Sequence, residues 1–180
     1  MPEAVSESIR INQCGVRLTK GDITDLEVDA FVFYAQPDLA LGSGIGTAIS
    51  VRGGLAVQKA LEGLGPLATG EAVASTAGDL KADSIIHAVG PRFREDDIED
   101  KLRTTVGNSL ELAEEKEIRR IAFPAMGAGY YGIAPDVCAR VMLEVIQSHL
   151  KGESHIEELV ICVLDTRQYE AFRAQLATLG

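Results

Sequence analysis

The sequence predicts a three-layer α/β/α sandwich around a mixed, largely parallel β-sheet. First, short apolar runs alternate along the chain with stretches of helical periodicity, as they do in layered α/β folds. Second, two glycine-rich segments each lie between a predicted strand and a predicted helix, where open α/β sheets usually bind ligands. Third, the length of 180 residues fits one domain, so we expect residues 1–180 to fold as a single unit.

The first half of the chain contains an expected hairpin and three further strands. Apolar runs on either side of Cys14-Gly15 predict the hairpin, and Pro91 ends the last strand because proline cannot continue a sheet ladder. We expect strands over residues 9–12, 16–20, 29–34, 72–76 and 84–89, and a glycine-rich segment over 42–54 that turns helical and continues as a helix over 56–64.

The second half alternates helices and strands. Apolar residues recur every three or four positions from Ile98 to Lys116, which places them on one helix face. Pro135 occupies the position favoured for a first helical residue. We expect helices over residues 98–116, 135–150 and 169–179, strands over 121–123 and 159–164, and a glycine-rich loop over 127–132.

The charge balance restricts the possible partners. The formal net charge is −10, and such a surface repels a nucleic-acid backbone, whose binding relies on clustered Lys and Arg. We therefore expect no bulk nucleic acid, whereas a small anionic ligand can still be held by the backbone N–H groups of one loop. No apolar run approaches the length of a membrane span and the first twelve residues do not resemble a secretory signal. We expect a cytoplasmic protein without a membrane partner.

The cysteines and histidines predict neither a disulfide framework nor a metal site. Cys14, Cys138 and Cys162 are far apart and odd in number, which is typical of reduced interior thiols, and Cys138 as a nucleophile would need a base. The three histidines are unclustered and lack HxxxH or HExxH spacing, so we expect no metal. His87 lies within a predicted strand, where we expect a structural role rather than general-base catalysis.

The two glycine-rich segments form the candidate site. They read Leu41-Gly-Ser-Gly-Ile-Gly-Thr47 and Pro124-Ala-Met-Gly-Ala-Gly-Tyr-Tyr-Gly132. Glycines at such connections let the backbone approach a phosphate and point N–H groups at it. The second segment also matches GxGxxG, but an NAD site needs an acidic residue about 20 positions later, and Asp165 follows Gly132 by 33 residues. The segments therefore predict a phosphate-bearing nucleotide and disfavour a dinucleotide oxidoreductase.

Taken in order, several segments resemble the macrodomain family of ADP-ribose-binding modules. The similarity runs from about Val16 to Leu164, nearly the whole chain. The segments are KGDIT at 20–24, VDAFVFYAQ at 28–36 beside the family's VDAIVNAAN, GSGIGTAI at 42–49 beside GGGVxGAI, Gly53-Gly54, TGEA at 69–72, IHAVGP at 86–91 beside IHTVGP, and FPA with GYYG at 123–125 and 129–132 beside FPAISTGIYG.

The resemblance implies a role for each candidate residue. It places Asp22 and the Ile23 N–H at the adenine edge, the first segment at one phosphate, the second segment at the other, and the Tyr131 ring over the distal ribose. An N-cap for Asp22 and a packed core tyrosine for Tyr131 are the alternatives. The implied ligand-binding residues are Asp22, Ile23, Gln36, Gly44, Ile45, Gly46, Thr47, Gly127, Ala128, Gly129, Tyr130, Tyr131 and Leu164.

The chain departs from the family where its hydrolase members carry catalytic groups. The final Asn of NAAN is Gln36 here, and the position of an Asp in the first glycine motif is Gly46, which can act neither as acid nor as base. Gln36 keeps an amide but moves it by about 1.5 Å, and a shift of about 1 Å can cost about 10²-fold in rate. Phe33 and Tyr34 also put bulk where small or polar residues are expected.

We therefore expect a module that binds free or macromolecule-linked ADP-ribose, without a cofactor, as a reader with weak or no hydrolase activity. Gln36 is the one candidate for a catalytic residue. The alternatives are a hydrolase of ADP-ribosyl or O-acetyl-ADP-ribose esters with a nonstandard catalytic residue, an NAD-binding oxidoreductase, and an interaction domain whose cleft Phe33, Tyr34 and Gln36 have closed.

Overall fold

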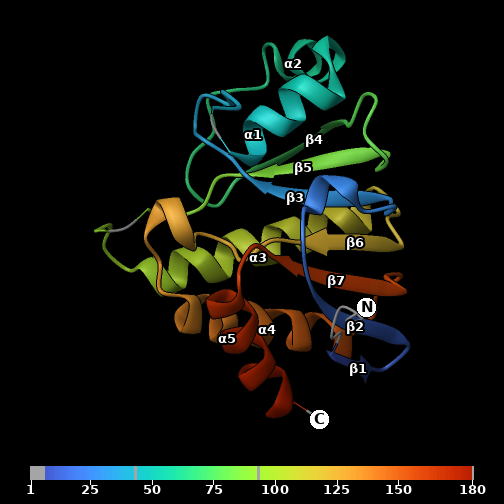
Figure 1. Cartoon of the computed structure of the whole chain (residues 1–180), viewed down its shortest axis with the longest axis vertical. Coiled ribbons are helices and arrows are strands. Elements are labelled where there is room, and N and C mark those ends of the chain that lie inside the picture. The colour runs from blue at the N-terminus through green and yellow to red at the C-terminus, as the bar shows by residue number, and fades with distance from the viewer. Residues whose placement is uncertain (1–6, 43, 93, 180) are drawn as a thin grey trace.

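The computed structural model describes residues 7–42, 44–92 and 94–179, with the side chain of Tyr130 excepted. Its strands form one sheet in the order β1-β2-β7-β6-β3-β5-β4 (Figure 1). The strands are β1 Glu7–Ile11, β2 Cys14–Lys20, β3 Ala30–Tyr34, β4 Ala72–Thr76, β5 Ser84–Ala88, β6 Arg120–Phe123 and β7 Glu158–Val163. All seven were expected from the sequence, and no strand end differs from its expected position by more than about two residues.

The sheet is mixed and largely parallel, as predicted. Strands β2, β7, β6, β3 and β5 run parallel to one another, whereas β1 and β4 pair antiparallel at the two edges. The carboxyl ends of the five parallel strands therefore lie along a single side of the sheet. Because both segments that the sequence singled out follow parallel strands, this arrangement brings them together.

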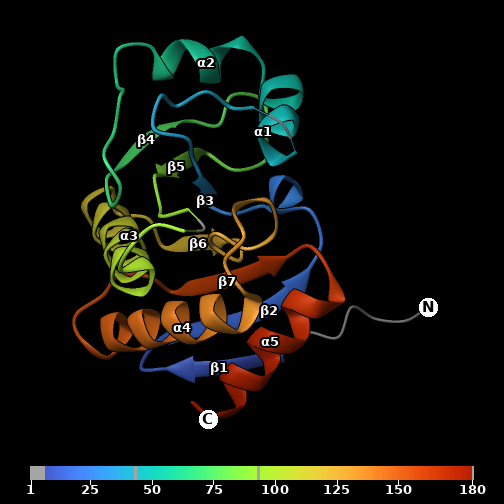
Figure 2. The same cartoon turned by 90° about the vertical axis from the view of Figure 1, so that its left-hand side faces the viewer.

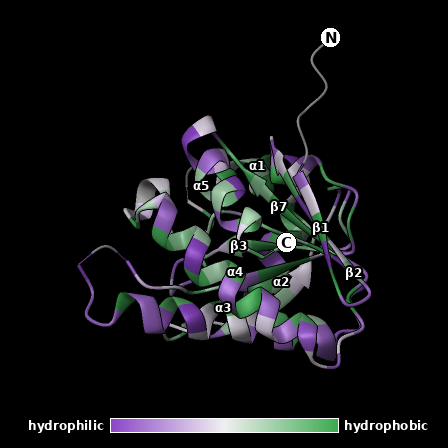
Figure 3. Cartoon of the chain, turned by 90° about the horizontal axis from the view of Figure 1, so that it is seen from below, coloured by the Kyte–Doolittle hydropathy of each residue, from purple (hydrophilic) through white to green (hydrophobic). Residues whose placement is uncertain are grey.

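Helices cover both faces of the sheet, which gives the three expected layers. On one face, α3 (Ile98–Glu115), α4 (Pro135–Lys151) and α5 (Thr166–Ala177) lie side by side (Figure 2). On the other face lie the short helix α1 (Ile45–Ala48), a π-helix η2 (Ile49–Gly53) and α2 (Leu55–Leu61). Figure 3 shows apolar residues concentrated between these layers, with hydrophilic residues on the outer sides of α3 and α4.

Two helices differ from the sequence prediction. The expected helix over 56–64 ends at Leu61, and the segment before it is split by a π-helical turn and by Gly54, whose φ of +83° favours glycine. The closing helix begins at Thr166 instead of Tyr169, because Asp165 caps it by accepting a hydrogen bond of 2.8 Å from the Gln168 N–H.

The buried titratable groups have structural environments. All three cysteines are buried free thiols, and burial raises the pKa of Cys138 to about 12 and that of Cys14 and Cys162 to about 11. Burial lowers the pKa of His87 to about 4, and its Nε2 lies 2.8 Å from the Ser75 hydroxyl. A neutral, fully buried histidine fits the structural role expected for it.

Neither a metal cluster nor a membrane span is found in the part of the chain that the structure describes. Within it, no group of three or more His, Cys, Asp and Glu side chains is arranged to hold a metal ion. None of the described helices is long and apolar enough to cross a membrane.

Asp29 fixes the start of β6 beside β3. Its Oδ2 accepts hydrogen bonds from the backbone N–H groups of Arg119 and Arg120, at 3.0 and 2.9 Å, while its own N–H donates to the Arg120 carbonyl. These bonds set the register at the amino end of the two strands that carry the candidate site at their other end.

We expect Asp29→Ala to reduce the free energy of unfolding by about 1–2 kcal/mol, because it removes the acceptor of two hydrogen bonds. Denaturant unfolding measures this difference. Asp83→Ala is the matched control, since that side chain is exposed and makes no hydrogen bond within the described residues. An equal loss in both variants would contradict the role assigned to Asp29.

Glu114 joins the end of α3 to the segment after α4. Burial by itself would raise the pKa of Glu114, but hydrogen bonds from Ser154, the His155 N–H and His149 outweigh it and lower the pKa. A carboxyl whose pKa is lowered on folding stabilises the protein above its unfolded pKa, and this contribution is lost as pH falls.

We therefore expect the wild-type chain to lose more stability than Glu114→Gln when the pH is lowered below about 5. Thermal unfolding at a series of pH values measures the difference. Parallel melting-temperature curves for the two proteins would contradict this prediction.

Candidate functional site

A pocket of about 380 Å³ opens at the carboxyl ends of the parallel strands. It lies between the two glycine-rich segments, which we call loop 1 (Leu41–Thr47) and loop 2 (Pro124–Gly132). Most of the lining is apolar. The lining residues are Ile23, Val32, Phe33, Tyr34, Gln36, Leu41, Gly44, Ile45, Pro124, Ala125, Gly127, Ala128, Gly129, Tyr131, Cys162, Leu164 and Gln168.

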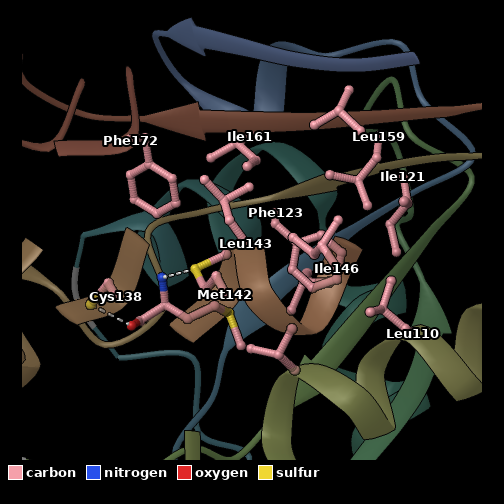
Figure 4. Packing of buried hydrophobic residues seen from close by; sticks show 14 of the residues in the cluster. Leu110, Ile121, Phe123, Cys138, Met142, Leu143, Ile146, Leu159, Ile161 and Phe172 are labelled. Atoms are coloured by element: carbon pink, nitrogen blue, oxygen red, sulfur yellow. Dashed lines mark hydrogen bonds between the residues drawn. The ribbon is translucent and has the colours of Figure 1, made fainter. Parts of the chain in front are cut away.

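Two sulfur atoms from α4 hold the base of loop 2. The Cys138 thiol donates to the Met126 carbonyl oxygen at 3.0 Å, and the Met126 N–H donates to the Met142 sulfur at 3.3 Å (dashed in Figure 4). All three residues are fully buried. Because burial raises the pKa of Cys138 to about 12, its thiol stays protonated and remains a donor. This residue therefore anchors the loop and does not act as a nucleophile.

Above this anchor, the backbone of loop 2 borders the pocket at Gly127, Ala128 and Gly129. Ala128 and Ile133 donate to carbonyl groups within the loop, at 3.1 and 3.0 Å. Within the described residues, the N–H groups of Gly127 and Gly129 make no hydrogen bond. Gly127 has a φ of +82°, and a Cβ on it would lie 2.4 Å from the Ile133 side chain, so no other residue fits without rearrangement. Free amides on an anchored loop are suited to an anionic group.

Loop 1 forms the opposite side of the pocket through Gly44 and Ile45. Gly44 has φ +63° and ψ −126°, a conformation open to glycine. The Thr47 hydroxyl closes the loop by donating to the Gly42 carbonyl oxygen at 3.0 Å. Gly46 packs directly on the backbone, and a Cβ there would lie 1.5 Å from the Leu41 carbonyl oxygen.

Gln36 lines the pocket beside loop 1. A Cβ placed on Gly42 would lie 2.7 Å from the Gln36 Nε2, so the amide group packs closely against that glycine. Gln36 is also held through its backbone, since its carbonyl accepts from the Leu39 N–H at 2.9 Å. The extra methylene of glutamine thus carries the amide toward loop 1.

At the other end, Ile23, Cys162 and Leu164 give the pocket an apolar surface. Ile23 belongs to the short 3-10 helix η1 (Ile23–Asp25), and its N–H makes no hydrogen bond within the described part of the chain. Gln168 also lies here, where its Oε1 accepts from the Leu164 N–H at 2.9 Å. A flat apolar group with one acceptor at its edge would suit this end.

Asp22 caps η1 and contacts Arg52 of η2. Its Oδ1 accepts from the N–H and the hydroxyl of Thr24, at 2.9 and 2.6 Å, and its Oδ2 lies 3.5 Å from the Arg52 guanidinium. Arg52 also donates to the Thr24 hydroxyl at 2.9 Å and pairs with Asp25. The N-cap alternative considered for Asp22 is therefore observed, and Arg52 connects η2 to η1, whose first residue Ile23 lines the apolar end of the pocket.

Comparison with known proteins identifies the family. The model of the Macro domain matches residues 34–142, which is more than half of the chain. The chain belongs to the macro domain family. A macro domain-containing protein of Caldanaerobacter subterraneus subsp. tengcongensis is 39% identical over 166 residues, covering 87% of this chain and 93% of the relative.

Solved macrodomains have the same fold. The Oceanobacillus iheyensis macrodomain with ADP superposes with a TM-score of 0.93 at 27% identity, covering 99% of this chain and 98% of that one. A mutant of the same macrodomain with ADPR gives a TM-score of 0.90 at 27% identity, with coverage of 97% and 98%. The three-layer macrodomain fold predicted from the sequence is thus confirmed.

The macrodomain pocket brings together nine of the thirteen residues proposed from the sequence. Ile23, Gln36, Leu164 and the lining residues of both loops contribute to it directly. Asp22, Gly46 and Thr47 do not line it: Asp22 caps η1, Gly46 packs on Leu41, and Thr47 closes loop 1. The side chain of Tyr130 lies outside the described part. The binding roles of all these residues remain predictions.

Sequence reasoning missed several lining residues. Val32 lies within β3, whose pocket-facing side was not assigned, and Pro124, Ala125 and Leu41 were noted only as the first residues of the two glycine-rich segments. Cys162 was assigned to the interior, where it is indeed buried, although it also borders the pocket. Gln168 lay outside the predicted helix, and its signal was the Asp165 cap three residues earlier.

The close contact at Gly46 makes this glycine indispensable in the present macrodomain. We expect Gly46→Ala to lower the free energy of unfolding by about 1–3 kcal/mol, because the new methyl group cannot avoid the Leu41 carbonyl. Thermal or denaturant unfolding measures the loss.

Gly107→Ala in α3 is the matched control for this substitution. Its Cβ would lie 4.0 Å from Val145, and alanine is the better helix former by about 0.5–1 kcal/mol, so this variant should be more stable. A Gly46→Ala protein as stable as the wild type would mean that the first turn of α1 can shift.

Proposed function

We propose that this macrodomain binds ADP-ribose, free or attached to a macromolecule, as a reader with weak or no hydrolase activity. The observation that carries the proposal is the pocket between two glycine-rich loops, with unused amides at Gly127 and Gly129 and an apolar end at Ile23, Cys162 and Leu164. The amides match a diphosphate and the apolar end matches adenine. Solved macrodomains that this chain resembles at 27% identity carry ADP and ADPR.

The weakness of hydrolysis is inferred from the positions of the family's catalytic groups. Gly46 offers no side chain, and its contact with the Leu41 carbonyl oxygen leaves no room for one. Gln36 packs against Gly42. Cys138 and His87, the nucleophile and base considered from the sequence, are fully buried. Binding needs amides and a shaped pocket, whereas turnover needs a placed acid or base.

The alternatives that the sequence left open fit these observations less well. A ligand-free interaction domain would require Phe33, Tyr34 and Gln36 to close the cleft, but the pocket between them and the loops is open. An NAD-dependent oxidoreductase would need an acidic residue for the ribose, and Asp165 instead caps α5. We infer no bulk nucleic-acid partner from the net charge of −10, and we propose a cytoplasmic location.

Calorimetric titration with ADP-ribose, AMP and NAD tests the binding. We expect ADP-ribose to bind in the micromolar range and more tightly than AMP. Asp22→Asn should weaken ADP-ribose binding by about tenfold or more, the effect of losing an acceptor that carries charge. Asparagine still caps a helix, so η1 should keep its shape.

Asp25→Asn is the control, because Asp25 also pairs with Arg52 but ends η1, whereas Asp22 directly precedes the pocket residue Ile23. This variant should bind within about threefold of the wild type. An equal loss in both variants would assign the effect to the Arg52 contacts instead of adenine recognition. Absence of any heat with all three ligands would overturn the proposed function.

A glycohydrolase assay on a mono-ADP-ribosylated peptide tests the second part of the proposal, that hydrolase activity is weak or absent. We expect no turnover above a no-enzyme blank, and none with Gln36→Asn, because Gly46 still lacks an acid or base. Turnover by the wild type that Gln36→Asn or Gln36→Ala abolishes would make the protein a hydrolase.

A further inference from the structure

Tyr34 closes one end of the pocket. It is the last residue of β3, and its side chain points to the same face of the sheet as that of Val32, toward α3 and α4. It is 7% exposed, and its hydroxyl donates a hydrogen bond to the Pro91 carbonyl oxygen. A Cβ on Gly90 would lie 2.4 Å from the ring, and one on Gly127 would lie 3.2 Å from the hydroxyl. The phenol therefore fills the space between loop 2 and the segment after β5.

Tyr131 and Arg92 extend this closure toward the surface. The rings of Tyr34 and Tyr131 are 4.8 Å apart at their centroids and tilted by 52°. The Arg92 guanidinium lies 5.8 Å from the centre of the Tyr131 ring, within the range of a cation–π contact. These side chains come from β3, loop 2 and the segment after β5, and together we call them the aromatic wall (Tyr34, Tyr131 and Arg92).

The pocket ends where the wall stands. Its lining follows the strand order from Ile23 after β2, through β7 and β6, to β3. No described residue of β5, or of the segment that follows it as far as Arg92, lines the pocket. Strands lie about 4.8 Å apart, so the four strand ends span roughly 14 Å. The volume of about 380 Å³ lies near the lower end of the range of small-molecule pockets, about 300–1,000 Å³.

The groups along this course fix how an adenosine diphosphate ester would lie. Ile23, Cys162 and Leu164 offer the surface for the base, and the free amides of Gly127 and Gly129 offer donors for the diphosphate. Next along the ligand would come the group esterified to the terminal phosphate, on the side of the pocket that Tyr34 lines. The Tyr34 hydroxyl donates its single hydrogen to the Pro91 carbonyl oxygen, so it has no hydrogen left to donate to a sugar hydroxyl.

We propose that the aromatic wall makes this site selective for the ADP part of its ligand, with the group on the terminal phosphate left at the pocket mouth. The ligand class is then ADP and its esters, whatever the terminal group carries. This inference rests on the proposed function and specifies it. A reader of this kind binds an ADP-ribosylated macromolecule through the end that is farthest from the attachment point.

Calorimetry with ADP and with ADP-ribose on the wild-type chain is the first test. We expect dissociation constants within about threefold of each other, because the terminal ribose adds few contacts. A peptide carrying one ADP-ribosyl group should bind with the same affinity as free ADP-ribose. Binding of ADP-ribose about 30-fold or more tighter than that of ADP would overturn the inference while leaving the proposed function intact. Binding of neither ligand would overturn both.

Variants of Tyr34 test whether its ring is the cause. Tyr34→Ala opens the space behind the wall, and we expect it to tighten ADP-ribose relative to ADP by about tenfold. Tyr34→Phe keeps the ring and removes the hydrogen bond to Pro91, so the ratio of the two affinities should stay at the wild-type value. An unchanged ratio in a folded Tyr34→Ala protein, or a lower one, would contradict the role of the ring.

Arg92→Ala provides a second route if a thermal melt shows that Tyr34→Ala does not fold. Arg92 is exposed, and its loss removes the cation–π contact that holds the Tyr131 ring. We expect a shift of the affinity ratio in the same direction as with Tyr34→Ala, by about two- to threefold. A shift toward ADP would mean that the wall binds the terminal group, which would overturn the inference.

Discussion

The parallel alignment of β3, β6 and β7 is the constraint on which the rest of the structure depends. Their register pairs Ala30 with Ile121 and Ile121 with Leu159, so the three strands start together and end on one side of the sheet. Two connections that are far apart in the sequence, loop 1 and loop 2, consequently face each other. The position of the pocket is therefore set by the alignment of the strands. The aliphatic core that holds the strands in register also maintains the shape of the pocket.

The two sides of the pocket are held by different kinds of contact. Loop 2 is fixed from below by Cys138 and Met142, two side chains one helical turn apart on α4. Their contacts to Met126 are buried, so the base of loop 2 is held in place by the core. Loop 1 is fixed through glycine, because the chain at Gly46 lies directly against the Leu41 carbonyl. This contact gives the loop its shape, and it also leaves no room for an Asp or Glu side chain at position 46.

The sequence was sufficient for the fold class, the strands and both loops, because these depend on local periodicity and on ordered motifs. It was insufficient for side chains whose direction is decided by tertiary packing. The sequence showed that Tyr34 is a large residue at a position where small or polar residues are expected. Its hydrogen bond to Pro91 and its contact with Gly90, however, depend on where β5 ends. Gln168 was missed because the start of α5 is set by the Asp165 cap, which overrides the apolar pattern. The break at Gly54 likewise follows from backbone geometry that periodicity does not report.

The two ends of the pocket differ in how far their supporting contacts are exposed to solvent. Arg52 joins η2 to η1 through Asp22 and Asp25, and all three side chains are about half exposed. Exposed ion pairs weaken as ionic strength rises, since the screening length falls to about 10 Å at 0.1 M salt and further above it. The sulfur contacts beneath loop 2 carry no net charge and lie in the core, so salt leaves them unaffected. The apolar end of the pocket should thus loosen in concentrated electrolyte while the glycine-rich end keeps its form, so the two ends of one small cavity respond separately to the surrounding medium.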